Sequence, residues 1–331
     1  MKTTIPAMSV KRVGNAIYIT IKDAGICSVS EFRDSGIENV VPLHGFPCII
    51  LGSSHDGLLV SACETLYFIS GSEARAILRV RPGNWFWHAT EGDGQIFVQE
   101  YGEPPTGIYV TEDLRSFKKI STNLSVDPLS RHLHSLAFDD SKERLIVTLG
   151  DDNIVRVAVS QDYGYAWKPL YKGPWQFVPI FISGDKWVFG FDSGIARGGV
   201  GVYNTKHDEW SFTFLKPVNY YNAQFTSLIK FGDYYIGCLG SPTAVAVSKD
   251  LKYWSPLYID SSITGYNPFV NVEIWKDKIV GVTGKELLIF DINDIEQALR
   301  SKPFLTPYKA YLDKVKGLAF TIKRIQWMLR L

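Results

Sequence analysis

The sequence predicts an all-β fold, a β-propeller with seven blades. Three observations lead to this prediction: short apolar runs rich in Val, Ile, Phe, Tyr and Trp, turn residues between the runs, and a repeat of about 43 residues. Sixteen prolines and 28 glycines are spread along the chain, as expected for many tight turns. Helix signals are nearly absent before residue 290, which excludes a helical solenoid of this period.

Each repeat contains three or four apolar strands, and a small polar residue closes the third strand. The clearest copies are residues 134–171 and 225–258. Weaker copies occupy residues 10–32, 49–70, 85–117, 177–210 and 270–294. The closing polar residues are Ser30, Ser70, Thr111, Ser160, Asn204, Ser248 and Asp291, at intervals of 40 to 49 residues. Seven such units match the blades of a propeller, and six blades with an irregular segment are the alternative.

The composition indicates a folded chain with an uneven charge distribution. Apolar residues make up 46% and charged residues 21%, and 35 Lys and Arg face 34 Asp and Glu. These values exclude a disordered chain and a protein that binds nucleic acid through bulk positive charge. Residues 300–331 carry a net charge of +7, which leaves about −6 for residues 1–299.

The four cysteines, Cys27, Cys48, Cys63 and Cys238, show no CxxC spacing. We therefore expect free thiols in a reducing compartment and neither a zinc site nor a disulfide framework. The first thirty residues have no continuous apolar stretch, so we expect no signal peptide and no transmembrane span. A cytoplasmic location follows, with the inner membrane surface as a possible peripheral site.

One repeat contains a sharper motif. Ser160, Asp162, Gly164 and Trp167 fit the pattern S-x-D-x-G-x-x-W, and shorter copies lie at Thr111, Asp113 and Phe117 and at Ser248, Asp250 and Trp254. The chain thus resembles the Asp-box, or bacterial neuraminidase repeat, superfamily of sialidase-like propellers over roughly residues 5–300. The resemblance implies that these residues are structural, because Asp-boxes form the turn between the third and fourth strands, away from the ligand face.

Sialidase activity does not carry over from this resemblance. The family's first arginine stands in a Phe-Arg-Ile-Pro stretch near the N-terminus, whereas the early arginines here lie in VKRVG and EFRDS. Arg81, Arg131 and Arg197 could supply three arginines, but no family motif surrounds them. Whether the chain is an enzyme stays open, and a glycosidase with two carboxylates is the alternative.

Ligands of propellers usually meet the face that carries two sets of loops, those leading into each first strand and those joining second to third strands. The candidate ligand-binding residues in these loops are Arg81, Trp85, Trp87, His88, Tyr101, Arg131, His132, Trp175, Arg197, Tyr221 and Gln224. The candidate catalytic residues are Glu64, Glu100, Asp151, Asp192, Glu273 and His134. Aromatic rings mixed with charged groups suit a polyhydroxylated ligand, although propeller cores also use many aromatic residues.

Two of these candidates have a specific rationale. Glu273 occupies a first-strand position where other repeats have apolar residues, so it is either ion-paired or has a raised pKa. His132 and His134 fall on one side of an extended segment, as an acid–base pair requires. Two histidines alone do not make a metal site, and we predict no metal and no cofactor.

The pattern changes after Asp291. Ile295 and Leu299, and then apolar residues from Tyr308 to Leu329, recur at helical spacing among Lys and Arg. We expect a propeller of residues 1–304 and a basic amphipathic helix of residues 305–331. The helix could dock on the acidic body, contact a second copy in a homo-oligomer, bind a partner or lie on an anionic membrane surface.

Three functions remain from the sequence. The leading one is a carbohydrate-directed propeller that binds or processes a glycan at its loop face. The second is a non-catalytic scaffold or assembly protein that recruits a partner or membrane through residues 305–331. The third is a glycoside hydrolase with a carboxylate pair at the channel mouth.

Overall fold

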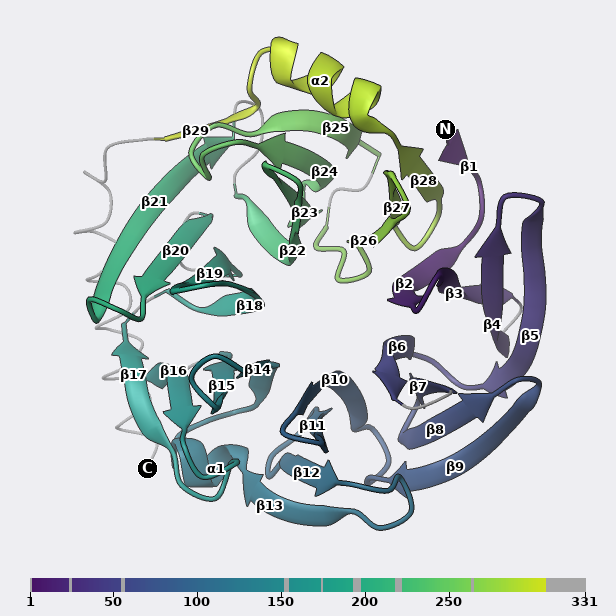
Figure 1. The fold of residues 1–331 in the computed structure, drawn as a ribbon, viewed down its shortest axis with the longest axis vertical. Helices are drawn as coiled ribbons and strands as arrows, with labels where there is room; N and C mark the ends of the chain where they lie inside the picture. The colour runs from purple at the N-terminus through teal and green to yellow at the C-terminus, as the bar shows by residue number, and fades with distance from the viewer. Residues whose placement is uncertain are drawn as a thin grey trace.

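The computed structural model describes residues 2–23, 26–54, 57–151, 155–173, 175–192, 198–217, 222–262 and 265–307, with side chains omitted at 23, 39, 40, 54 and 217. The strands of these residues form seven antiparallel sheets arranged as blades in a ring (Figure 1). The predicted seven-bladed propeller is therefore confirmed, and the six-bladed alternative is excluded.

The first four blades follow one another along the chain, each running from the innermost to the outermost strand. Blade 1 contains β2 (Ala7–Val13), β3 (Ala16–Asp23), β4 (Ile26–Arg33) and β5 (Gly36–His44). Blade 2 contains β6 (Cys48–Ser54), β7 (Gly57–Ala62), β8 (Thr65–Ser70) and β9 (Glu73–Arg79). Blade 3 contains β10 (Trp85–Gly92), β11 (Gln95–Tyr101), β12 (Gly107–Thr111) and β13 (Lys118–Thr122). After the short helix α1 (Asn123–Val126), blade 4 contains β14 (Leu133–Asp139), β15 (Arg144–Leu149), β16 (Val155–Ser160) and β17 (Lys168–Lys172).

The last three blades include strands from both ends of the described chain. Blade 5 contains β18 (Phe177–Ser183), β19 (Lys186–Phe191), β20 (Gly199–Asn204), β21 (Glu209–Pro217) and β29 (Leu305–Pro307). Blade 6 contains β22 (Gln224–Phe231), β23 (Tyr234–Ser241), β24 (Thr243–Ser248) and β25 (Ser255–Asp260). Blade 7 contains β26 (Asn271–Trp275), β27 (Lys278–Val282), β28 (Leu287–Phe290) and β1 (Lys2–Thr3).

The ring is closed by hydrogen bonds between the first and last strands of the propeller. β1 pairs with β28, with Lys2 opposite Leu288, and so completes blade 7 from the N-terminal side. The Lys2 Nζ atom also lies 2.7 Å from Glu286 Oε1. The chain leaves β1 for the innermost strand of blade 1, so the first and last blades are joined both covalently and by this pairing.

Hydrophobic packing between neighbouring blades explains the apolar runs of the sequence. Seven clusters of buried side chains occur, one at each interface between adjacent blades. The middle strands β7, β16 and β24 are buried along their whole length, whereas the outermost strand β9 is largely exposed. Strands covered on both faces read as continuous apolar runs, and this is the pattern that the sequence shows.

The turns with the Asp-box pattern have the hydrogen bonds expected of them. The Ser160 hydroxyl donates to Asp162 Oδ1 at 2.7 Å and accepts from the Gly164 N–H at 2.7 Å. In all three turns the residue after the aspartate has a positive φ, which is 58° at Tyr163, 56° at Leu114 and 63° at Leu251, and the shorter copies lack the glycine that follows Tyr163. All three turns join third to fourth strands, so they lie at the end of the propeller opposite to the loops between second and third strands.

The segment after blade 7 runs around the outside of the ring (Figure 1). Helix α2 (Ile292–Arg300) is capped by Asp291 and buries Ile295 and Ala298 against blades 6 and 7. The expected helix start at residue 305 is wrong, because residues 305–307 form β29 on the free edge of β21, and Leu305 is also hydrogen-bonded to Trp254. The remainder of the expected helix, residues 308–331, lies outside the described residues.

The expectation of four free thiols is also wrong. Cys27 of β4 and Cys48 of β6 form a disulfide between blades 1 and 2, with a Cα–Cα distance of 6.4 Å, whereas Cys63 and Cys238 are free. The two partners are 21 residues apart, so no short spacing in the sequence marks them. Within the described ranges, no helix is long and apolar enough to cross a membrane.

Candidate functional site

The loops that lead into first strands and the loops between second and third strands lie at one end of the propeller, here called the mouth. Seven side chains at this end, contributed by blades 3 to 6 and by the loop before blade 7, interact with one another. This mouth cluster consists of Tyr101, His132, His134, Asp151, Asp192, Gln224 and Tyr266. All but Tyr266 are among the site residues predicted from the sequence.

An aromatic row borders the mouth cluster. The ring centroids of Trp87 and Tyr101 are 4.3 Å apart, those of Trp85 and Tyr101 are 4.9 Å apart, and Tyr101 lies 4.5 Å from His132. The pairing of β10 with β11 shifts its register between Phe86 and His88, where Trp87 is the extra residue. Both tryptophans, two positions apart on the strand, line the central cavity, and His88 after the bulge lines it as well.

The two histidines of the cluster form a buried pair. His132 Nε2 lies 3.2 Å from His134 Nε2, and His134 Nδ1 lies 3.2 Å from the carbonyl oxygen of Phe177. A carbonyl can only accept, so His134 Nδ1 carries the proton and its Nε2 atom accepts from His132. Burial, and then the charge of His132, lowers the pKa of His134, which stays neutral. A Cβ atom on Gly150 would lie 1.9 Å from His134 Nε2, so only glycine fits beneath the pair.

Two aspartates of the cluster have pKa values shifted in opposite directions. Burial raises the pKa of Asp192 to about 7, even though Gln224 Nε2 donates to its Oδ1 at 3.0 Å and Tyr266 also bonds to it. Burial also acts on Asp151, but the neighbouring histidines, the hydrogen bond from Gln176 and the charge of Arg131 together outweigh it, and the pKa of Asp151 is lowered overall. Its Oδ2 atom lies 3.7 Å from His132 Nε2. Near neutral pH, the mouth cluster therefore contains one carboxyl that is easily protonated and one that is ionised.

Tyr266 connects the loop before blade 7 to this carboxyl pair. Its ring packs over Gly240 at the end of β23, and its hydroxyl bonds to Asp192. Desolvation, followed by the charge of Asp192, raises the pKa of Tyr266 well above its ordinary value. Tyr266 was not among the predicted binding residues. The available signal was its position in a loop leading into a first strand, which it shares with several predicted members.

A buried arginine supports the cluster from below. Arg156 of β16 is 1% exposed, and its guanidinium donates to the carbonyl oxygens of Gly150 at 3.1 Å and Gly173 at 2.9 Å. It also donates to Gln176 Oε1 at 3.3 Å, and Gln176 in turn donates to Asp151 at 3.2 Å. Arg156 is not among the predicted site residues, and its signal in the sequence is a lone charge within the apolar run VRVAVS.

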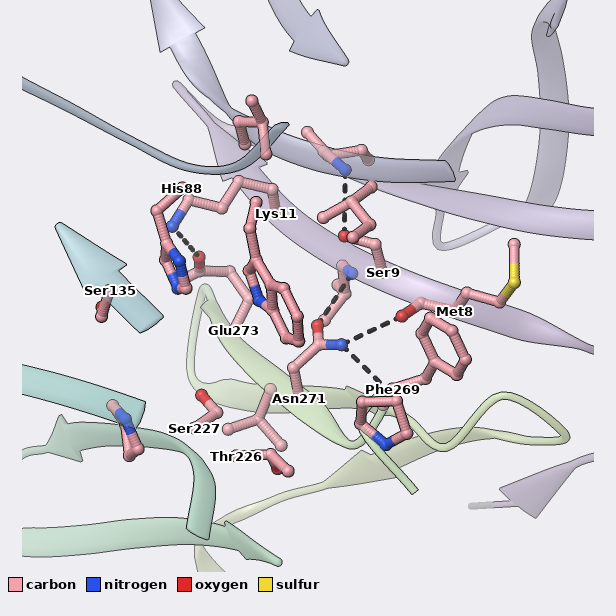
Figure 2. Close-up of a pocket in the computed structure, with 18 of the residues that line it drawn as sticks. Met8, Ser9, Lys11, His88, Ser135, Thr226, Ser227, Phe269, Asn271 and Glu273 are labelled. Carbon is pink, nitrogen blue, oxygen red and sulfur yellow. Dashed lines mark hydrogen bonds and ion pairs between the residues drawn. The ribbon is translucent and has the colours of Figure 1, made fainter. Parts of the chain in front are cut away.

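The mouth opens into a cavity of about 720 Å³ along the axis of the ring (Figure 2). All seven first strands line it, and Trp85 and Trp87 belong both to its wall and to the aromatic row. Glu273 Oε2 lies in it 3.8 Å from Lys11 Nζ of the neighbouring blade 1, so the predicted ion-paired carboxylate is present. His88 also lines the cavity, and burial, together with the charge of Lys11, lowers its pKa to about 4.

Several predicted site residues have other surroundings. Glu64 forms an ion pair with Arg79 at 2.6 Å. Glu100 is 3% exposed and accepts hydrogen bonds from Asn84, Gly107 and Tyr109, which makes it a structural carboxylate of blade 3. Neither carboxylate faces the mouth cluster.

The remaining predicted binding residues divide into three groups. Trp175 is 7% exposed in the core between blades 4 and 5, so it lacks the open ring face that stacking requires. Arg81 donates to the carbonyl oxygens of Glu103 and Pro104, whereas the charge of Arg131 reaches Tyr101 and Asp151. Arg197 and Tyr221 lie outside the described residues. Across the part of the chain that is described, no group of three or more His, Cys, Asp or Glu is placed to hold a metal ion.

Comparisons with known proteins establish the fold and not a family. No protein-family model matches the chain, and no curated protein matches it. The extracellular domain of the one-component system BT4673 from B. thetaiotaomicron matches with a TM-score of 0.64 at 8% identity, over 87% of this chain and 38% of that one. A puromycin-hydrolyzing peptidase from Mycobacterium tuberculosis matches with a TM-score of 0.56 at 14% identity, over 82% of this chain and 48% of that one.

A third structure matches over nearly its whole length. BamB from Moraxella catarrhalis has a TM-score of 0.52 at 10% identity, over 88% of this chain and 98% of that one. The chain thus spans less than half of the first two matched proteins and almost all of the third. At these identities, the shared property is the propeller fold.

Proposed function

We propose that this chain is a carbohydrate-binding β-propeller that holds a glycan at its mouth. The observation that carries the proposal is the row of Trp85, Trp87 and Tyr101 beside the hydrogen-bonded pair of Asp192 and Gln224. Sugar rings pack their C–H faces on aromatic rings, while their hydroxyls pair with carboxyl and amide groups. The resemblance to Asp-box propellers adds support, because the three turns have the hydrogen bonds that it implies.

A glycan array followed by calorimetry on the best glycan tests this function. We expect the wild-type protein to bind at least one glycan, and Trp87→Leu to weaken that binding by about tenfold or more, because a stacking surface is lost. Trp167→Leu is the matched control, since Trp167 lies in an Asp-box turn at the opposite end of the propeller. Absence of any bound glycan, or equal losses in the two variants, contradicts the proposal.

A specific observation favours glycoside hydrolysis as a second candidate function. Glycosidases use one carboxylic acid with a raised pKa and one ionised carboxylate, and Asp192 and Asp151 differ in this way. In this role Asp192 protonates the glycosidic oxygen as the bond to the anomeric carbon breaks. Asp151 either attacks that carbon or takes a proton from the attacking water.

Release of 4-nitrophenol from a panel of aryl glycosides tests the second candidate. Hydrolysis should fall as pH rises above about 7, where Asp192 loses its proton, and both Asp192→Asn and Asp151→Asn should abolish it. Asp140→Asn, on an exposed turn of blade 4, serves as the control. Binding without hydrolysis by the wild-type protein leaves glycan binding as the function and excludes hydrolysis of these substrates.

A further inference from the structure

We infer that the ligand of this propeller is amphipathic, with a sugar at the mouth and an apolar tail in the central cavity. The inference rests on the proposed function and names the class of ligand, a glycoside with an alkyl or acyl chain. It comes from a contrast between two adjoining regions. The mouth cluster presents polar groups, whereas the cavity below it presents a mainly apolar wall.

Three polar residues of the cavity wall, Ser9, Thr226 and Asn271, are occupied by hydrogen bonds between and within blades (Figure 2). The Ser9 hydroxyl accepts from the Ile50 N–H at 3.1 Å, and Thr226 Oγ1 donates to the Val270 carbonyl oxygen at 2.6 Å. The Asn271 amide accepts from the Val10 N–H at 3.0 Å and donates to the carbonyl oxygens of Met8 and Phe269. These three residues are committed to the protein, whereas Trp85 Nε1 and His88 Nδ1 of the same wall lack a hydrogen-bond partner within the described residues. The remaining lining residues are mostly apolar.

That surface comes from several blades at once. Partly exposed apolar side chains line the cavity, namely Ile49, Ala89, Ile180, Phe181, Ile229 and Phe269. A volume of about 720 Å³ falls within the range of small-molecule sites, and its apolar lining favours an aliphatic or aromatic group. Trp85 and Trp87 belong to both regions, which makes the sugar platform and the cavity continuous.

A charged pair marks the deep limit of the apolar region. Lys11 Nζ and Glu273 Oε2 lie 3.8 Å apart in the cavity, and the Lys11 side chain is 43% exposed and the Glu273 side chain 19% exposed. A hydrocarbon chain gains nothing by displacing the water around these charges. The cavity should therefore accept a tail of limited length.

Calorimetry with alkyl glucosides, galactosides and N-acetylglucosaminides tests this inference, using each probe below its critical micelle concentration. Within the series of the best-bound sugar, the affinity should rise by about fourfold for each added CH₂ from methyl to hexyl. It should level off once the tail reaches Lys11 and Glu273. The corresponding n-alkanols should bind more weakly than the glycosides of equal chain length.

A variant that fills the cavity tests whether the tail of the ligand binds there. Ser227 lines the cavity from β22, so Ser227→Phe should remove the dependence on chain length and keep the affinity for the methyl glycoside. Ser211→Phe, on the exposed outer strand β21, is the control. If Ser227→Phe does not fold, Ser227→Leu takes its place.

The possible failures can be told apart. Equal affinity for methyl and hexyl glycosides overturns the tail site and leaves the sugar site standing. Equal affinity for a glycoside and its alkanol overturns the proposed sugar site, and with it the amphipathic ligand. No binding of any probe overturns both.

Discussion

Gln224 donates a hydrogen bond of 3.0 Å to Asp192, and this contact joins the start of blade 6 to the end of the second strand of blade 5. The carboxyl is 9% exposed, and its burial is what raises the pKa. The two residues are 32 positions apart and belong to neighbouring blades, so the packing of blade 5 against blade 6 brings them together. The chemistry of the mouth therefore depends on how neighbouring blades pack.

The stability of the protein should fall as pH rises through the range in which Asp192 ionises. Its pKa is about 7 when folded, against an ordinary value of 3.8, so the folded state binds the proton more tightly than the unfolded state. The resulting stabilisation is complete below about pH 4, and it is lost as pH rises towards 7 and beyond. The difference is on the order of a few kcal/mol.

Asp192→Asn isolates this contribution. Asn keeps an Oδ1 acceptor for Gln224 and cannot ionise, so the variant should be more stable than the wild-type protein at pH 8 and about equal at pH 4. Urea denaturation at the two pH values measures the difference. Parallel pH profiles for the two proteins would contradict the assigned cause.

Removing the buried arginine should disturb both stability and binding. Arg156→Met leaves two backbone carbonyl oxygens and Gln176 without a charged donor, which should cost several kcal/mol of unfolding free energy. Glycan affinity should fall as well, because Gln176 positions Asp151. Arg144→Met, at the other end of the adjacent strand β15, is the control for loss of a positive charge. A stable Arg156→Met variant with unchanged affinity would show that this network does not hold the site.

The Asp-box aspartate should matter for stability alone. Asp162→Ala removes the acceptor for the Ser160 hydroxyl and for the Ala166 N–H, which should lower the unfolding free energy by about 1–2 kcal/mol. Glycan affinity should stay unchanged, because this turn lies at the end opposite to the mouth. Thermal denaturation and calorimetry on the same preparation measure both effects. A tenfold loss of affinity in a folded variant would contradict the structural role.

The number of reactive thiols should reveal the disulfide between blades 1 and 2. Without reductant, the denatured protein should show two thiols to Ellman's reagent, Cys63 and Cys238, and four after reduction. The variant Cys27→Ser with Cys48→Ser should lose about 3 kcal/mol of stability, the value expected for closing a loop of this length. Four reactive thiols in the unreduced protein would contradict the bond.

The sequence predicts the blades well because their signals are local. Ser70, Thr111, Ser160 and Ser248 each end a third strand, as the repeat indicates. The S-x-D and T-x-D patterns also correspond to turns in the structure, because the hydrogen bonds of such turns span only a few residues.

Contacts between different blades leave no local signal in the sequence. The pairing of β1 with β28, the Cys27–Cys48 bond and the contact of Asp192 with Tyr266 each join residues of different blades or of the loops between them. The site residues Trp175 and Trp87 also cannot be distinguished from the sequence alone. Both are tryptophans at the mouth end of a blade, yet one is buried in the core and the other borders the cavity.

The crystal structure of the protein with its best-bound glycan tests the central claim most directly. We expect a sugar ring stacked on Trp87 or Tyr101, with a hydroxyl within hydrogen-bonding distance of Asp192 or Gln224. Density for the glycan at the Asp-box turns, or on the outer strands of the ring, would contradict a binding site at the mouth.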